Sequence, residues 1–235
     1  MADTDPNLSN WGFEMKKIVA VLILLVILSS AIVFAETNQF LSFYNSGTFS
    51  YVFPDDEFSS YSSLGFSAVT GWENDDFCFS IEASMDSEGY SGSLSYSRFF
   101  GNGLFLAAEV DVGTSTADKS LIIGAMGIVG IRLDGIGKSW IELGLAPNFT
   151  YQRSSDYSVT DLSICLSIDD YCPISDSMTM VFGATVAGIT IFTNEKDLKT
   201  GETESLSINS FGIMLRAGLK YSFPAAPIAP KLKTK

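Results

Sequence analysis

The stretch that decides the fold is residues 209–223, NSFGIMLRAGLKYSF. Its odd-numbered positions from Phe211 to Phe223 are all apolar, whereas its even-numbered positions are polar or small apart from Met214. Successive side chains of a β-strand point to opposite faces. This segment therefore predicts a strand with one apolar face and one polar face.

The same alternation recurs along the chain. Five further segments show it clearly: residues 77–86, 90–98, 104–113, 141–152 and 161–169. Four show it more weakly: residues 40–53, 61–72, 121–133 and 179–192. Repeated alternating segments of about ten residues, separated by turn-forming residues, are typical of transmembrane barrels. We predict an all-β fold: a single up-and-down antiparallel transmembrane β-barrel of ten strands, or of eight if the first pair lies outside the wall.

Alternation alone does not say which face is inside, because a secreted soluble β-protein would bury its apolar face. Three features favour an apolar face towards lipid. The polar faces are rich in serine and glycine, which suits a narrow lumen, and their charges are sparse and of mixed sign. Most segments also reach the roughly 9–11 residues that a tilted membrane strand needs. The soluble β-protein is kept as the alternative.

The connections predict a topology. Compact turns lie at residues 72–76, 101–103, 134–138 and 172–176. The intervening connections are more polar and are expected to be longer, the longest being residues 194–205. Short periplasmic turns and longer outer loops are the usual arrangement, which places Phe223 in the periplasm. Trp140, Tyr171 and Tyr221 then fall at the periplasmic ends, where aromatic rings favour the headgroup zone.

The N-terminal region predicts export. An apolar run over residues 18–34 follows Lys16 and Lys17 and ends in the small residue Ala35. This pattern is typical of a signal peptide over residues 15–35, cleaved after Ala35. Residues 1–14 contain no basic residue, so we interpret them as a start-site extension, with Met15 as the true start. An uncleaved membrane anchor is the alternative, since seventeen residues is the lower limit for a spanning helix.

The charge of the chain excludes nucleic-acid binding. Of its 14 basic and 27 acidic residues, residues 1–35 contain two and three, so the mature chain carries 12 − 24 = −12. Such an acidic protein repels nucleic acid.

Cysteine and histidine usage excludes the common metal motifs. Cys165 and Cys172 lie seven residues apart on one predicted strand, too far for a disulfide along a continuous strand. Cys78 is the third cysteine, and we expect reduced thiols. Histidine is absent, which removes any Cys/His metal motif. No cofactor and no metal site is expected.

The leader, the ten alternating segments and the final residues 215–223 together resemble the small bacterial outer-membrane β-barrel families. The last segment resembles the C-terminal signal read by the barrel-assembly machinery, with Leu219, Tyr221 and Phe223 as its assembly-signal residues. The resemblance implies an outer-membrane location, with membrane lipid and the assembly machinery as partners, and a monomer is favoured. The families usually end on the aromatic residue, whereas residues 224–235 here continue as a proline- and lysine-rich segment, interpreted as a periplasmic tail after the barrel of residues 36–223.

Catalysis is not expected. Enzymes among these families commonly use histidine as acid or base, and this chain has none. Glu109 and Asp111 could form a carboxylate pair, but a solvated or salt-bridged lumen explains them more simply. The acidic runs at residues 55–57 and at Asp169 and Asp170 lack the spacing of a calcium loop and are interpreted as ordinary turns.

The charged residues expected inside the barrel form the candidate site. This predicted lumen network consists of Glu82, Glu109, Asp111, Arg132, Glu142, Asp161, Arg216 and Lys220. Charges in a low-dielectric lumen must pair or stay hydrated. Arg132 and Glu142 flank the 134–138 turn on one face and are expected to form a cross-strand ion pair. Our hypothesis is that the network plugs the lumen.

Three functions follow as hypotheses. The first is a barrel with a structural or surface-contact role, carried by outer loops such as residues 194–205. The second is a narrow passive channel for small solutes, lined by the predicted lumen network. The third is a secreted soluble β-protein that binds a ligand or a host surface.

Overall fold

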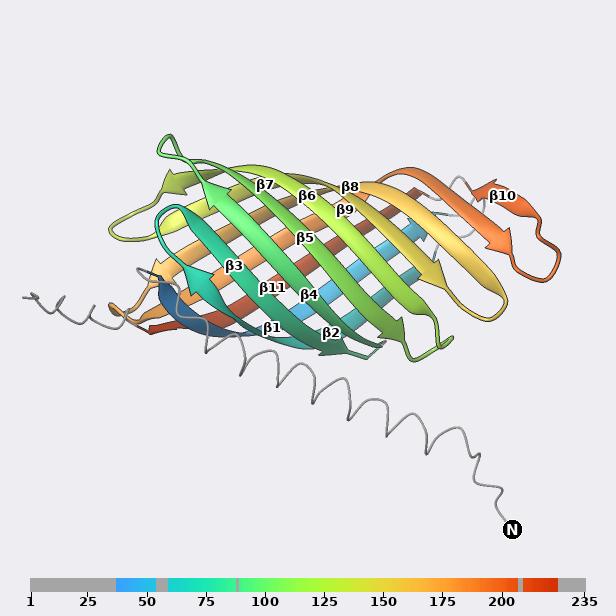
Figure 1. Ribbon diagram of the computed structural model, residues 1–235, viewed down its shortest axis with the longest axis horizontal. Helices are drawn as coiled ribbons and strands as arrows, with labels where there is room; N and C mark the ends of the chain where they lie inside the picture. The colour runs from blue at the N-terminus through green and yellow to red at the C-terminus, as the bar shows by residue number, and fades with distance from the viewer. Residues whose placement is uncertain (1–36, 54–58, 88, 207–208, 224–235) are drawn as a thin grey trace, which may run out of the picture. The chain divides into compact units, whose positions relative to one another are not determined.

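The protein is an all-β molecule. The computed structural model describes residues 37–53, 59–87, 89–206 and 209–223 (Figure 1). The predicted start-site extension, signal peptide, Ala35 cleavage site and C-terminal tail lie outside these residues. The described strands are β1 (Asn38–Phe53), β2 (Ser59–Glu73), β3 (Phe77–Asp86), β4 (Gly89–Phe99), β5 (Leu104–Ser115), β6 (Leu121–Asp134), β7 (Trp140–Arg153), β8 (Tyr157–Pro173), β9 (Met178–Asp197), β10 (Thr203–Leu206) and β11 (Asn209–Phe223). In the described part, no helix combines the length and apolarity needed to cross a bilayer.

The sheet closes on itself. Each strand from β1 to β9 pairs antiparallel with the next, β11 pairs with β9, and β11 also pairs with β1. These ten strands form the wall of an up-and-down barrel. Among the described strands, β10 pairs with β9 alone. The prediction of ten wall strands is confirmed. The eight-strand alternative is wrong, because β1 and β2 pair with each other over their length inside the wall.

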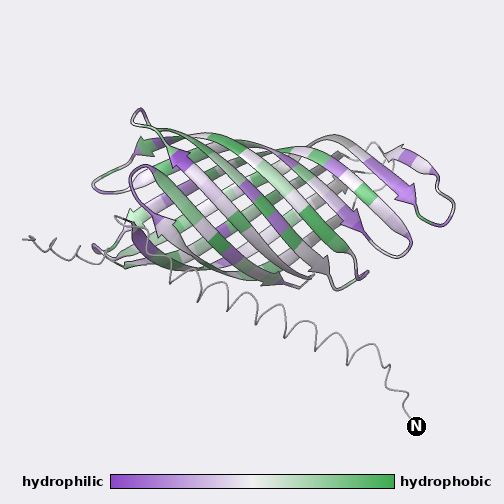
Figure 2. Cartoon of the chain, viewed as in Figure 1, coloured by the Kyte–Doolittle hydropathy of each residue, from purple (hydrophilic) through white to green (hydrophobic). Residues whose placement is uncertain are grey.

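The apolar face points outward. On β11, Leu219 is 48% exposed, whereas the adjacent Lys220, on the inner face, is 8% exposed. On β5, Leu106 is likewise exposed while its neighbour Phe105 is buried. Figure 2 shows hydrophobic and hydrophilic residues alternating along the wall strands. A contiguous apolar surface of this kind needs lipid around it, and closure leaves no wall edge for lipid to meet. The predicted direction of the apolar face is confirmed.

The outer connections were expected to be longer than the periplasmic ones, and this is wrong for those joining β3–β4, β5–β6 and β7–β8, although the chain between β9 and β11 is long. The barrel has a terminus end, where Asn38 and Phe223 lie, and an opposite loop end. Connections at the terminus end contain three to five residues, and those joining β3–β4, β5–β6 and β7–β8 at the loop end contain two, five and three. Towards the loop end, the strands continue beyond the residues that show apolar alternation. Residues that the sequence suggested were loop are therefore part of the strands.

Residues 194–205 are also not a loop. β9 continues to Asp197 and turns through residues 198–202 into β10, with Thr193 opposite Leu206 and Lys196 opposite Thr203. This β9–β10 hairpin projects beyond the wall (Figure 1). The segment escaped prediction because both of its faces are polar. The segment lies outside the apolar band of the barrel. Its sequence therefore lacks the alternation of apolar and polar residues that would identify it as a strand.

Candidate functional site in the barrel lumen

A row of charges crosses the lumen near the terminus end. The strand register places Arg216, Gly183, Asp169, Glu142 and Arg132 side by side on β11, β9, β8, β7 and β6. The Arg216 Nε atom donates to Asp169 Oδ1 at 2.9 Å, and its Nη2 atom lies 2.8 Å from the same oxygen. The Arg132 Nε and Nη2 atoms donate to Glu142 Oε1 at 2.9 and 2.5 Å. Two arginines thus bracket two carboxylates.

Gly183 makes room for one of these pairs. It lies between Arg216 and Asp169, and the arginine side chain passes over it to reach the carboxylate. A Cβ atom at this position would lie 2.1 Å from Asp169 Oδ1 and 2.7 Å from Arg216 Nε. A residue with any side chain would therefore displace the ion pair, so the glycine is needed here for close approach rather than for backbone freedom.

A third ion pair spans the seam where the sheet closes. Lys220 of β11 donates to Glu73 Oε2 of β2, passing over the intervening strand β1. Ser222 donates to Glu73 Oε1 at 3.4 Å. The Lys220 ammonium also lies 4.4 Å from the centre of the Phe40 ring. The first and last strands are thereby joined through side chains as well as through the backbone ladder.

Aromatic rings surround these cations. Arg132 lies 4.0 Å from the Phe99 ring centre and 5.5 Å from that of Trp140, which stacks on Tyr171 at 4.9 Å. Arg216 lies 5.5 Å from the ring centre of Tyr44. Such cation–π contacts add to the ion pairs, most of all where water is excluded. We call the three ion pairs and these rings, together with Phe40, the ion-pair layer.

The ion-pair layer corrects two interpretations from the sequence. Trp140 and Tyr171 were expected in the membrane headgroup zone, but their register with Asp134 and Glu142 places both on the inner face. Asp169 was interpreted as part of a turn, yet β8 continues to Pro173 and the carboxylate pairs inside the barrel. The alternation of residues 161–169 already placed Asp169 on the polar face, and that signal was outweighed by the adjacent Asp170.

The remaining residues of the predicted lumen network have different surroundings. The Arg132–Glu142 pair expected from the sequence is present, whereas the sequence does not predict the partners of Arg216 and Lys220. Asp161 accepts a hydrogen bond from Thr193 at 2.8 Å.

Four carboxylates of the predicted lumen network have no cation partner among the described residues. Glu82, Glu109, Asp111 and Asp161 form no ion pair there. The described residues also contain no group of three or more acidic or cysteine side chains arranged to hold a metal ion. Cys78, Cys165 and Cys172 are free thiols, as expected.

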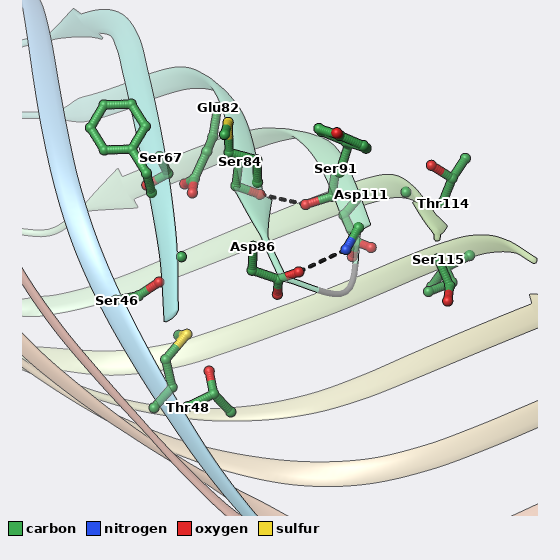
Figure 3. Close-up of a pocket in the computed structure, with 18 of the residues that line it drawn as sticks. Ser46, Thr48, Ser67, Glu82, Ser84, Asp86, Ser91, Asp111, Thr114 and Ser115 are labelled. Atoms are coloured by element: carbon green, nitrogen blue, oxygen red, sulfur yellow. Dashed lines mark hydrogen bonds between the residues drawn. The ribbon is translucent and has the colours of Figure 1, made fainter. Parts of the chain in front are cut away.

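A cavity lies between the ion-pair layer and the loop end of the barrel. It has a volume of about 460 Å³ and extends from Tyr44 and Arg216 to Gly89 and Ser115, where β4 and β5 reach the loop end. We call it the vestibule. Its polar lining includes Ser46, Thr48, Ser67, Glu82, Ser84, Asp86, Ser91, Asp111, Thr114 and Ser115 (Figure 3). Gln152 also lines it. Most of these side chains are small, which leaves the space open.

The loop end is held together by hydrogen bonds centred on Asp118, in the connection between β5 and β6. Asp118 Oδ2 accepts from the Tyr157 hydroxyl and from Gln152 Nε2, the latter at 3.1 Å. Asp118 Oδ1 accepts from the backbone N–H and the hydroxyl of Ser120. The Tyr157 hydrogen bond, followed by those from Ser120, holds the pKa of Asp118 well below its ordinary value of 3.8.

The β9–β10 hairpin is fastened to the same surface. Lys199 Nζ lies 2.8 Å from Asp156 Oδ1, in the connection between β7 and β8. The backbone N–H of Leu198 donates to the carbonyl oxygen of Asp156 at 2.9 Å. Within the turn, Asp197 Oδ1 accepts from the N–H groups of Lys199 and Thr200. The projecting hairpin therefore has a defined conformation against the loop end.

The closed sheet and its outward apolar band define the class of the protein: it is a transmembrane β-barrel, with the even number of antiparallel wall strands that is usual for bacterial outer-membrane barrels. No protein-family model matches the chain, and no curated protein matches its sequence.

The chain is similar to several solved outer-membrane barrels. Neisserial surface protein A is 12% identical, with a TM-score of 0.35, over 78% of this chain and 97% of that chain. The translocator domain of the autotransporter NalP from Neisseria meningitidis is 10% identical, with a TM-score of 0.35, over 92% and 98%. An outer membrane channel from Pseudomonas putida F1 is 8% identical, with a TM-score of 0.42, over 80% and 96%.

Proposed function

We propose that the protein is a non-catalytic outer-membrane barrel that acts at the cell surface through its loop end, chiefly through the β9–β10 hairpin. The observation that carries this proposal is that the hairpin continues β9 beyond the wall and is fastened to the β7–β8 connection by the Lys199–Asp156 pair. An ordered projection loses little conformational freedom when it binds a partner. The sequence supports the absence of catalysis, because no histidine is present to move protons.

The ion-pair layer supports the proposal that the lumen does not conduct ions. Its side chains come from β1, β2, β4 and β6 as well as from β7, β8 and β11. A ten-stranded barrel is only slightly wider than one that its own side chains fill. The narrow channel is the second candidate, and the vestibule is the observation that favours it, since it hollows the lumen from the loop end.

Two measurements test the proposal. Planar-bilayer recordings of the refolded protein are expected to show no stable single-channel current, and large stable currents would favour the channel. The second measurement compares cells bearing the intact barrel with cells in which residues 195–204 are replaced by an Asn-Gly turn. The shortened barrel is expected to keep its heat-modifiable gel mobility and to lose cell attachment to protein-coated or glycan-coated surfaces. Unchanged attachment to every surface would refute the role of the hairpin.

A further inference from the structure

The vestibule combines an open space with acidic side chains. Glu82, Asp86 and Asp111 line it (Figure 3), and Arg216 at its floor is already engaged by Asp169. Glycine and hydroxyl residues maintain the space. Gly113, for example, lines the cavity at a position where a Cβ atom would lie 3.0 Å from the Tyr90 carbonyl oxygen. The volume of about 460 Å³ accommodates a small organic molecule as well as water.

The described lumen residues offer no spare cation to Glu82 and Asp111. Among the described lumen residues, Arg132, Arg216 and Lys220 are paired with Glu142, Asp169 and Glu73 respectively. Glu82 and Asp111 therefore face the cavity without a counter-ion from the described chain. A carboxylate in a partly dehydrated lumen is stabilised by any cation that can enter.

The spacing of the carboxylates selects the kind of cation. Glu82 lies opposite Ser93, and Ser93 lies opposite Asp111, so the two carboxylate-bearing strands are separated by the whole of β4. Two strand spacings amount to about 10 Å between the backbones. A single inorganic ion needs its oxygen ligands at about 2.0–2.6 Å, which this arrangement does not favour. A flexible molecule with an ammonium group at each end can contact both carboxylates.

The rest of the lining suits such a molecule. Tyr44, Ile122 and Met214 supply apolar surface for a methylene chain. Ser46, Ser67 and Ser115 supply hydroxyl groups that can accept hydrogen bonds from an ammonium. From this combination we propose that the vestibule binds a small linear diammonium or polyammonium compound, which enters from the loop end. This proposal does not rest on the role of the hairpin at the cell surface.

Isothermal titration calorimetry on the refolded protein in detergent micelles at low ionic strength tests the proposal. 1,4-Diaminobutane is expected to bind about tenfold more tightly than butylamine, because it forms a second charge-assisted contact. Magnesium chloride is expected to bind no more tightly than butylamine. Added salt is expected to weaken diamine binding. Equal affinity for the diamine and the monoamine, tighter binding of magnesium, or absence of binding heat would overturn the proposal.

Variants locate the site. Glu82→Gln and Asp111→Asn are each expected to lower diamine affinity about tenfold, to the level of the monoamine. Asp161→Asn is the matched control, because Asp161 is a lumen carboxylate on the far wall that does not line the vestibule. An equal loss in the control variant would place the binding elsewhere and refute the assignment. Should either vestibule variant fail to fold, the comparison of diamine with monoamine on the native sequence still decides the outcome.

Discussion

Lys220 of the last strand pairs with Glu73 of the second strand, across the first strand that lies between them. Their side chains are 10% and 25% exposed, so both charges are largely removed from water. Because a barrel has no stability as an open sheet in lipid, the seam between β1 and β11 is where closure is completed. The ion pair reinforces that seam from the inside.

Removing the lysine is expected to weaken closure. Lys220→Met leaves the Glu73 carboxylate without its cation and should lower the free energy of unfolding by roughly 2–4 kcal/mol. Denaturant unfolding in micelles, followed by tryptophan fluorescence, measures the change. Adding Glu73→Gln to Lys220→Met should restore much of the loss, since no uncompensated charge then remains. The exposed Lys138–Asp176 pair, with side chains 83% and 95% exposed, is the control. Lys138→Met should change stability by less than about 1 kcal/mol.

Replacing each of two wall glycines by alanine should have different effects on stability. Gly183→Ala places a Cβ atom 2.1 Å from Asp169 Oδ1 and should cost roughly 2–3 kcal/mol by separating the Arg216–Asp169 pair. Gly127 is exposed on β6, and a Cβ atom there has nothing within 4 Å. Gly127→Ala should be neutral or stabilise the barrel by up to about 1 kcal/mol, because alanine reduces the freedom of the unfolded chain. Equal losses in both variants would show that the contact at Gly183 is not the cause.

The hydrogen bonds to Asp118 at the loop end should persist in mild acid. The folded-state pKa of Asp118 lies below its ordinary value of 3.8, so its stabilising effect is present above that value. The effect is lost only as pH falls through the lower, folded-state pKa. At about pH 4 the connection between β5 and β6 should therefore stay ordered in the native protein. NMR titration of the Asp118 carboxyl carbon measures its pKa.

Tyr157→Phe removes the first of the donors that depress this pKa. The Asp118 pKa should rise towards 3.8 in this variant, and proteolytic nicking of the connection between β5 and β6 should increase at about pH 4. Tyr151→Phe serves as a control, since Tyr151 lies on the outer face of β7. An unshifted titration in Tyr157→Phe would contradict the role given to the hydroxyl.

The ion-pair layer should limit passage through the lumen. Arg216→Ala combined with Asp169→Ala removes both members of one pair, so neither charge is left buried alone. The double variant should conduct ions in planar bilayers where the native barrel does not. The surface pair Lys199→Ala with Asp156→Ala, which lies outside the lumen, should leave conductance unchanged. If the correctly folded double variant of Arg216 and Asp169 conducts no ions, this pair does not block the lumen.

The wall of the barrel could be predicted because its signal is local. In residues 209–223, each apolar residue on an odd position contributes to one face whatever the rest of the chain does. A short turn also largely determines which residues of its two strands lie opposite each other. The pairing of Arg132 with Glu142 across the 134–138 turn could therefore be predicted. The Arg216–Asp169 and Lys220–Glu73 pairs could not be found in this way, because each skips over an intervening strand.

By itself the sequence determined that this chain forms ten alternating strands with an apolar outer face, because period-two alternation depends only on backbone geometry and on the solvent at each face. Only the tertiary structure decided which carboxylate each lumen cation pairs with, since that depends on the register and curvature of non-neighbouring strands. The same holds for the vestibule between Glu82 and Asp111, whose volume arises from small residues brought together on separate strands. The β9–β10 hairpin belongs to this second group, because outside the apolar band the backbone ladder forms without any hydrophobic period.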